Sequence, residues 1–281
     1  MVTRRGFLPL LAAGALPRPA RGVEARIGLE LYSLRSEMKK DVPGTLALAR
    51  RMGFEEVETG DFYGRTAESF RKELERAGLR ATALMSSWAD LHERLDRVAG
   101  DARTLGAGYV ACPVIPHKNK QFTAEDCRLA IARFSAWAGA LAKNGLTFCY
   151  HLHGIEFRPS SQGTLADTLI RETAAAGVMF EMDTFWIQHG GEDPAGYLRR
   201  YPGRFPLAHL KDRRPGLAAG THPADVMEED SVVLGTGTID WKAFFREAPK
   251  AGVRHYYIEE EHPNAVAQIP QSLRFLKGLE I

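Results

Sequence analysis

The chain has 281 residues, 44% of them hydrophobic, which is typical of a globular protein and excludes a disordered one. Its 37 Lys and Arg residues are balanced by 35 Asp and Glu residues, so the charge gives no case for nucleic acid as a partner. Cys112, Cys127 and Cys149 form no CxxC pair, which speaks against a disulfide framework and favours packing as small apolar residues.

The first 25 residues differ from the rest. Arg4 and Arg5 are followed by Phe7, Leu8 and a short apolar run with Pro, Ala and Gly, the pattern of an export signal of the twin-arginine type. The run is shorter than the ~20 apolar residues that span a bilayer, so no stable membrane anchor is expected. We expect cleavage near Ala20 or Ala25 and a periplasmic or secreted protein. If the segment is instead a simple basic tail, the protein is cytoplasmic.

The remaining residues alternate between strand-like and helix-like segments. Residues 26–33 form the first expected strand, and Asp41 with Pro43 opens the first helix, which Gly53 ends. The other expected strands cover residues 56–59, 79–85, 109–115, the first half of 147–157, 178–183, 205–212 and 256–260. The other expected helices cover residues 67–77, 91–105, 131–141, 165–175, a segment that starts at 193–194, 239–251, and a last segment that ends near 279. Eight such alternations predict one closed (β/α)8 barrel over residues 26–281.

The segment 147–157 carries the first candidate site. His151 and His153 alternate with Tyr150 and Leu152, so the two imidazoles point to the same side of the strand. Gly154 ends the strand, and Glu156 follows shortly after. These residues form either a wet, hydrogen-bonded polar face or part of a metal or catalytic site.

Similar residues occur at the ends of the next three strands. Asp183, His209 and Glu259 each stand where a strand of a barrel would open onto the active-site face. Carboxylates and imidazoles suit Mn²⁺, Co²⁺, Mg²⁺ or Zn²⁺. Because four successive strands each offer a ligand at the same relative place, the pattern predicts a metal site; a satisfied polar network is the alternative.

With these residues in view, the chain resembles the sugar phosphate isomerase/epimerase family, the xylose isomerase-like barrels, over nearly everything after residue 25. The stretches that carry the resemblance are IGLELYSLR (27–35), YHLHGIEF (150–157), EMDTFW (181–186), YPGRFPLAHLKD (201–212), GTGTIDW (235–241) and YYIE (256–259). The resemblance implies that strands five to eight supply a Glu, an Asp, a His and a Glu to one divalent metal, with Mn²⁺ the first expectation. Asp183, His209 and Glu259 match the last three positions. Glu156 takes the first role, with His151 and His153 as alternative ligands or catalytic bases.

The site chemistry then predicts a sugar isomerase or epimerase. A metal that binds two oxygens of an α-hydroxy-carbonyl sugar acidifies the C–H between them, and a base removes that proton to give a metal-bound enediolate. The candidate bases are the carboxylates Glu156 and Glu259 and the two histidines of the fifth strand. Lys211 is expected to stabilise the enediolate oxygen and contact the substrate, and Trp186 to stack on a sugar face.

Three other functions compete with this prediction. A lyase or hydratase on a keto-sugar or keto-glycoside would use the extra histidines and suit an exported protein. A non-catalytic exported sugar-binding protein would keep the site without turnover. A metal-dependent phosphodiesterase on damaged DNA is disfavoured by the neutral charge and the export signal. In each favoured case the partner is a small sugar, and a homo-oligomer is compatible with the sequence.

Overall fold

The computed structural model describes residues 26–117, 121–223 and 226–281, and the predicted export signal lies outside them. Eight strands form a closed barrel in the order β1-β12-β9-β8-β5-β4-β3-β2, and every neighbouring pair is parallel. The strands are β1 (Ile27–Glu30), β2 (Glu56–Thr59), β3 (Arg80–Met85), β4 (Tyr109–Cys112), β5 (Thr147–His151), β8 (Met179–Asp183), β9 (Leu207–Leu210) and β12 (His255–Ile258). The predicted fold class is therefore confirmed.

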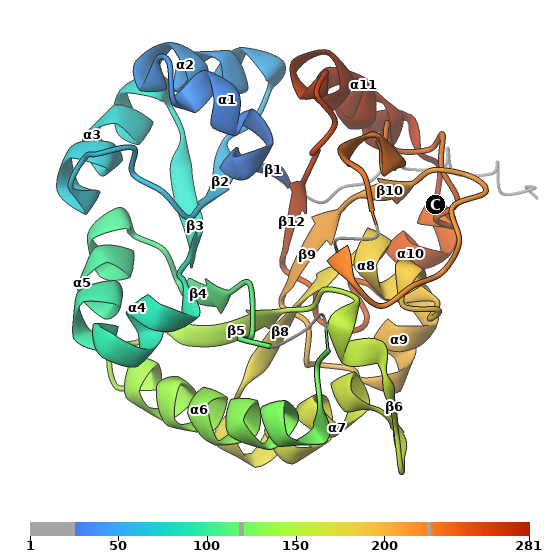
Figure 1. Ribbon diagram of the computed structural model, residues 1–281. Coiled ribbons are helices and arrows are strands. Elements are labelled where there is room, and N and C mark those ends of the chain that lie inside the picture. The colour runs from blue at the N-terminus through green and yellow to red at the C-terminus, as the bar shows by residue number, and fades with distance from the viewer. Residues whose placement is uncertain (1–25, 118–120, 224–225) are drawn as a thin grey trace, which may run out of the picture.

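Helices surround the barrel and cover the outer faces of the strands (Figure 1). They are α1 (Arg35–Met38), α2 (Val42–Met52), α3 (Ala67–Ala77), α4 (Trp88–Glu93), α5 (Leu95–Leu105), α6 (Ala124–Ala142), α7 (Leu165–Glu172), α8 (Thr184–His189), α9 (Pro194–Arg200), α10 (Trp241–Glu247) and α11 (Ala265–Gly278). None of the helices formed by the described residues combines the length and the apolar character that crossing a membrane requires.

Local sequence signals account for most helix boundaries. Asp41 accepts a hydrogen bond from Gly44 N at the start of α2, and Gly53 ends this helix in the left-handed region at φ 109°. The segment 91–105, expected to be one helix, is two, because Arg94 adopts an extended φ of −139° between α4 and α5. The periodic apolar stripe continues across this break, so periodicity alone did not reveal it.

The barrel interior holds two distinct layers. In the middle of the strands, Tyr257 packs with the small residues Ala83, Ala111 and Cys149. The Tyr257 hydroxyl lies 2.7 Å from the Thr82 hydroxyl. Towards the C-terminal ends, the interior is lined by buried carboxylates and imidazoles instead of the branched apolar residues that usually fill such barrels. This polar layer is where the candidate site lies.

Asp212 organises the loops that follow β9. It lies in β10 (Asp212–Arg213), which pairs with β11 (Ser231–Val232). Its fully buried carboxylate accepts hydrogen bonds from the backbone N–H groups of residues 213, 235, 237 and 239 and from the Trp241 indole. The Gly235-Thr236-Gly237 turn thus wraps an aspartate, and a Cβ at Gly237 would lie 2.2 Å from Asp212 Oδ1.

Candidate metal centre

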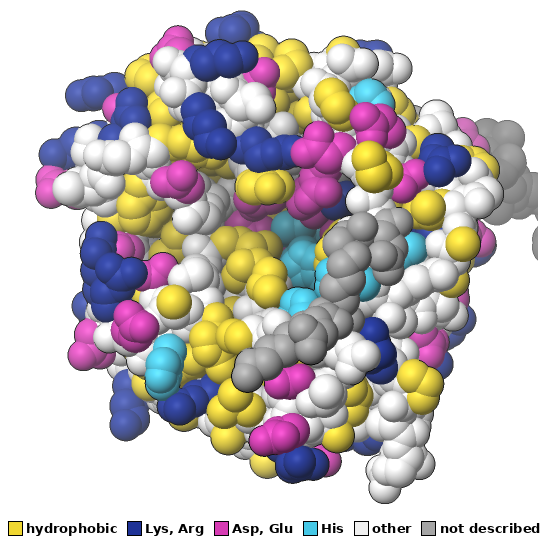
Figure 2. All heavy atoms as spheres, viewed as in Figure 1, with side chains coloured by type: hydrophobic (Ala, Val, Ile, Leu, Met, Phe, Trp, Pro, Cys, Tyr) yellow, Lys and Arg dark blue, Asp and Glu magenta, His cyan; other side chains and the backbone are white. Residues whose placement is uncertain are grey.

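A cavity of about 630 Å³ opens at the C-terminal ends of the strands. Histidine and acidic side chains lie together at the bottom of this hollow (Figure 2). His151, His209 and Glu259 form one part of its wall, and the loops after β1 to β4 form another. This is the face on which enzymes of the barrel class carry their active sites.

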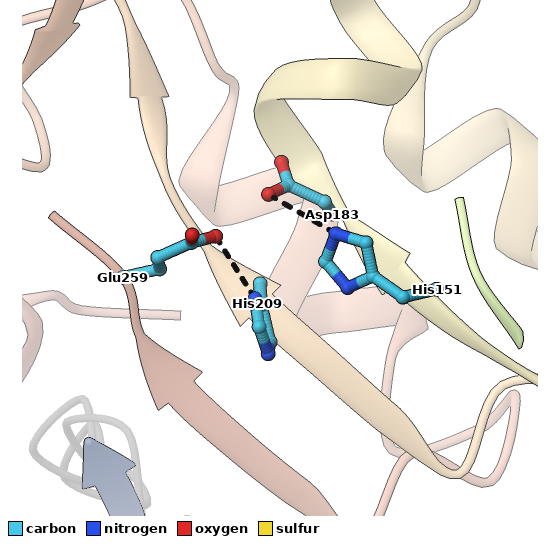
Figure 3. A group of neighbouring side chains, drawn as sticks. All are labelled: His151, Asp183, His209 and Glu259. Atoms are coloured by element: carbon cyan, nitrogen blue, oxygen red, sulfur yellow. Dashed lines mark hydrogen bonds and ion pairs between the residues drawn. The ribbon is translucent and has the colours of Figure 1, made fainter. Parts of the chain in front are cut away.

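Four side chains converge beside this wall: those of His151, His209 and Glu259, which line the cavity, and that of Asp183, which is buried behind them. They offer ligand atoms that all lie within 4.8 Å of one another, and all four residues are buried (Figure 3). His151 and Asp183 are the last residues of β5 and β8, His209 lies in β9, and Glu259 directly follows β12. Because these strands are parallel neighbours in the barrel, their ends bring the four side chains to one place.

The donor atoms fit a divalent cation. Asp183 Oδ1 accepts a hydrogen bond from Trp186 N at the start of α8, whereas the buried Oδ2 has no hydrogen-bond partner among the described residues. His151 Nε2 lies 4.0 Å from Asp183 Oδ2, and His209 Nδ1 lies 2.9 Å from Glu259 Oε2. Two imidazoles and two carboxylates with atoms left over for a ligand suit Zn²⁺, Mn²⁺, Co²⁺ or Fe²⁺.

Both imidazoles are held from behind by buried carboxylates. His151 Nδ1 lies 3.0 Å from Glu181 Oε2, and His209 Nε2 lies 2.6 Å from Glu58 Oε2. Glu58 and Glu181 are fully buried. Carboxylates in this position fix the ring orientation and tautomer of metal-ligating histidines. The structure therefore contains the outer support that such a centre requires.

The electrostatics of the group favour bound positive charge. Burial raises the pKa of Asp183. Burial and the neighbouring Glu181 raise the pKa of Glu58 to about 7. Burial alone would lower the pKa of His209, but Glu181, Glu259 and Glu58 raise it overall. Burial is the main cause of the shift at the two carboxylates, and neighbouring negative charge is the cause at His209, so both conditions favour a bound proton or cation.

Glu156, expected as the fifth-strand ligand, is not brought to this group. Its fully buried carboxylate accepts hydrogen bonds from the Tyr150 hydroxyl and from His153 N. Tyr150 points away from the barrel interior and packs against Phe134 of α6, with ring centroids 4.8 Å apart. The 3-10 turn η2 (Ile155–Phe157) folds Glu156 back to that outer side. His151, named as the alternative ligand, stands in the group instead.

The remaining predicted site residues take different places. His153 lines the cavity, and its ring centroid lies 4.6 Å from that of His151. Trp186 and Lys211 are almost completely buried and are not among the described residues that line the cavity. Lys211 Nζ lies 3.1 Å from Glu261 and 3.9 Å from Glu259, and sits 5.4 Å from the centroid of the Trp186 ring.

Sequence analysis missed the supporting carboxylates Glu58 and Glu181, and also Glu30, which lies in a second buried group with Glu58 and His209. Glu181 precedes Asp183 by two residues on β8, a spacing that places both on the same face of the strand. Glu58 follows Glu56 by two residues on β2, and its carboxylate lies inside the barrel, 2.6 Å from His209 Nε2. The sequence signal that could have revealed them is a carboxylate at a strand position that points into the barrel.

Closed parallel strands with this group at their C-terminal ends define a (β/α)8 barrel protein with a candidate metal centre. The chain belongs to the xylose isomerase-like TIM barrel family, whose model matches residues 46–279. A search of curated proteins found no match.

Three solved structures illustrate the likeness. A sugar phosphate isomerase/epimerase from Parabacteroides distasonis is 23% identical, with a TM-score of 0.73 over 90% of this chain and 98% of that one. A protein named IOLI with a bound zinc atom is 13% identical, with a TM-score of 0.73 over 91% and 99%. An L-ribulose 3-epimerase is 17% identical, with a TM-score of 0.68 over 90% and 93%. At these identities the likeness establishes the fold alone.

Proposed function

We propose that the protein is a divalent-metal-dependent sugar isomerase or epimerase that removes a proton next to a carbonyl and passes through an enediolate. The observation that carries this proposal is the convergence of His151, Asp183, His209 and Glu259, three of which line the cavity while Asp183 lies buried beside them. Membership of a family whose solved relatives include sugar isomerases and epimerases gives it further support.

The four converging residues would hold the cation. When bound there, a divalent ion supplies Lewis acidity, which makes a C–H next to a carbonyl easier to deprotonate. Mn²⁺ remains our first choice for the metal, and the zinc-bound relative makes Zn²⁺ the main competitor. Glu58 and Glu181 fix the imidazoles of His209 and His151 in the orientation that binding requires.

His153 is our candidate for the base. It lines the cavity next to His151, and its buried Nδ1 has no hydrogen-bond partner among the described residues. Glu259 is less suited, because its Oε2 already faces His209 at 2.9 Å and Lys211 at 3.9 Å. Lys211 lies behind the wall and would position Glu259 through their charges.

A lyase or hydratase of the same fold is the second candidate. Elimination needs one base, whereas returning the proton to the opposite face of the substrate needs a second group. Among the described residues that line the cavity, His153 is the histidine outside the four-residue group, and it lies beside that group. One base beside the group is enough to start an elimination, and an acidic lining side chain such as Glu30 or Glu261 could protonate the expelled substituent.

Two measurements test the proposal. First, metal analysis of purified variants should show that Asp183→Ala and His151→Ala lose the cation, while Glu156→Gln keeps it. Second, solvent deuterium should enter a panel of ketoses and aldoses incubated with the metal-loaded protein, and His153→Ala should slow that exchange by about 10² to 10⁴-fold. Full metal retention by Asp183→Ala would refute the assigned metal centre. Bound metal without any exchange or turnover would refute the enzyme and leave a sugar-binding protein. Elimination products instead of exchanged isomers would favour the lyase.

We also propose that residues 1–25 direct export, on the strength of the Arg4-Arg5 pair and the short apolar run after it. Fusion of this segment to a reporter that folds before export should bring the reporter to the periplasm. Replacement of both arginines by Lys should stop that transport. Unchanged transport of the doubly substituted fusion would contradict the twin-arginine assignment.

A further inference from the structure

The cavity is larger than a single sugar ring needs. Its volume of about 630 Å³ lies in the middle of the roughly 300–1,000 Å³ range of pockets that enclose drug-sized ligands. The metal-binding group and His153 occupy the side formed by β5, β8, β9 and β12. The loops after β1 to β4 form the rest of the wall.

Tyr32 presents an aromatic ring on that second side. The residue lies in the 3-10 turn η1 (Leu31–Leu34) that follows β1, lines the cavity and is 50% exposed. The Arg35 guanidinium lies 4.5 Å from the Tyr32 ring centroid. Arg35 is itself held by Glu228 and by the backbone oxygens of Tyr32 and Glu261. The ring is therefore supported in a fixed orientation while half of the residue stays open.

Tyr63 stands close by in the loop after β2. It is the one non-glycine residue in the described part of the chain with a positive φ, at 51°. Tyr63 N donates a hydrogen bond to Asp61 Oδ1 at 2.7 Å, and Arg65 Nη1 donates to Tyr63 O at 2.9 Å. A left-handed backbone is unfavourable for a bulky side chain and is typical of functional positions. The strained backbone of Tyr63 costs the loop some stability while its side chain lies in the cavity wall.

The charges around the cavity point to a neutral occupant. Arg35 and Lys39 are the basic side chains among the described lining residues, and Arg35 is paired with Glu228. The acidic lining residues are Glu30, Asp61, Glu259 and Glu261. Because Arg35 is paired with Glu228, Lys39 is left as the one basic lining side chain without an ion pair among the described residues. Away from the metal-binding group, the wall therefore offers no cluster of free positive charge that would bind a phosphate.

We propose that the site takes a keto-glycoside, with the ring that carries the carbonyl at the metal-binding group and a second, uncharged ring against Tyr32 and Tyr63. Glycosides without that carbonyl serve in the binding test as ligands that bind without reacting. The inference rests on the proposed function and adds the substrate class to it. Planar aromatic side chains offer a large apolar face that suits either the apolar side of a sugar ring or an aromatic aglycone. The two sources of the second ring share this chemistry, and the test separates them.

The test is calorimetric titration of the Mn²⁺-loaded protein with three matched series, built on D-glucose, D-galactose and D-xylose. Each series contains the free sugar, its methyl glycoside, its phenyl glycoside and a disaccharide (cellobiose, lactose and xylobiose). In at least one series we expect a ligand with a second ring to bind about tenfold more tightly than the methyl glycoside, which controls for substitution at the anomeric oxygen. A gain with phenyl alone identifies an aromatic aglycone, and a gain with the disaccharide identifies a second sugar.

Variants locate the second ring. Tyr32→Ala and Tyr63→Ala should each remove most of the tenfold preference and leave binding of the methyl glycoside within about twofold. Tyr32→Phe should retain the preference, because it keeps the ring. Leu129→Ala, an exposed apolar residue on α6 away from the cavity, is the matched control and should change nothing. Since Tyr32 is half exposed, its truncation should leave the thermal unfolding midpoint nearly unchanged.

Two results would overturn the inference. Equal binding of the methyl, phenyl and disaccharide ligands in all three series would show that no second ring is recognised. An unaltered preference in Tyr32→Ala and Tyr63→Ala would place the second ring elsewhere. If free sugars still exchange deuterium in either case, the proposed function stands and the glycoside inference alone fails. If no sugar or glycoside binds or exchanges, both fail.

Discussion

Replacement of Glu156 by Gln should stabilise the folded protein at alkaline pH and have little effect at acidic pH. The Glu156 carboxyl is fully buried between Tyr150 and the His153 backbone. Burial, which outweighs those two hydrogen bonds, raises its pKa from 4.5 to about 7. Gln has nearly the same shape as the protonated acid and retains an oxygen that can accept a hydrogen bond.

The sign and size follow from proton linkage. Because the folded-state pKa lies above the unfolded value, the folded protein binds this proton more tightly than the unfolded chain does. The resulting stabilisation is fully present below pH 4.5 and is lost as the pH rises through about 7. Each pH unit between these values is worth about 1.4 kcal/mol, so the total approaches ~3 kcal/mol. The free energy of unfolding of Glu156→Gln, relative to wild type, should therefore rise by about that amount from pH 4.5 to pH 8.

Urea unfolding with a chelator present, at several pH values in this range, measures the difference directly. Glu93→Gln, an exposed substitution of the same chemistry on α4, controls for the loss of one carboxyl group. A difference between wild type and Glu156→Gln that does not change with pH would refute the reasoning. It would mean either that the Glu156 carboxyl is hydrated or that it belongs to the metal centre after all.

Three further predictions concern support of the site and of the barrel. Glu181→Gln should lower metal affinity by about 10 to 100-fold, because Glu181 orients His151; a chelator competition titration measures it, and an unchanged affinity would contradict that role. Asp212→Ala should lower the free energy of unfolding by at least ~3 kcal/mol, since several buried donors lose one acceptor; denaturant unfolding measures the loss, and a change below ~1 kcal/mol would show that water or another group replaces the carboxylate. Gly28→Ala should cost about 1–3 kcal/mol in the same assay, because a Cβ there would meet the Tyr257 ring at 2.8 Å; a neutral result would show that the ring moves aside freely.

Most of the fold could be predicted from the sequence because local signals mark the strands and helices of the barrel. Strand 56–59 and helix 67–77 appear in the structure with the predicted bounds, and Gly53 and Gly78 end their helices in the left-handed conformation. Strand ends were less accurate. The expected strand 205–212 is only Leu207–Leu210 in the barrel, because its residues from Asp212 on pair with β11. Alternating hydrophobicity reveals that a strand exists, but the neighbouring strand decides where pairing stops.

The sequence by itself placed His151, Asp183, His209 and Glu259 at strand ends, since an alternating strand pattern and parallel order define which residues reach the active-site face. Only the tertiary structure decided which of them meet. Glu156 lies five residues after His151, yet the turn at Gly154 directs it to the outside of the barrel. Glu58 lies 151 residues from His209, yet closure of the barrel places it 2.6 Å away. A short separation along the chain does not fix the direction of a side chain after a turn. Closure of the barrel brings together residues that no local sequence pattern connects.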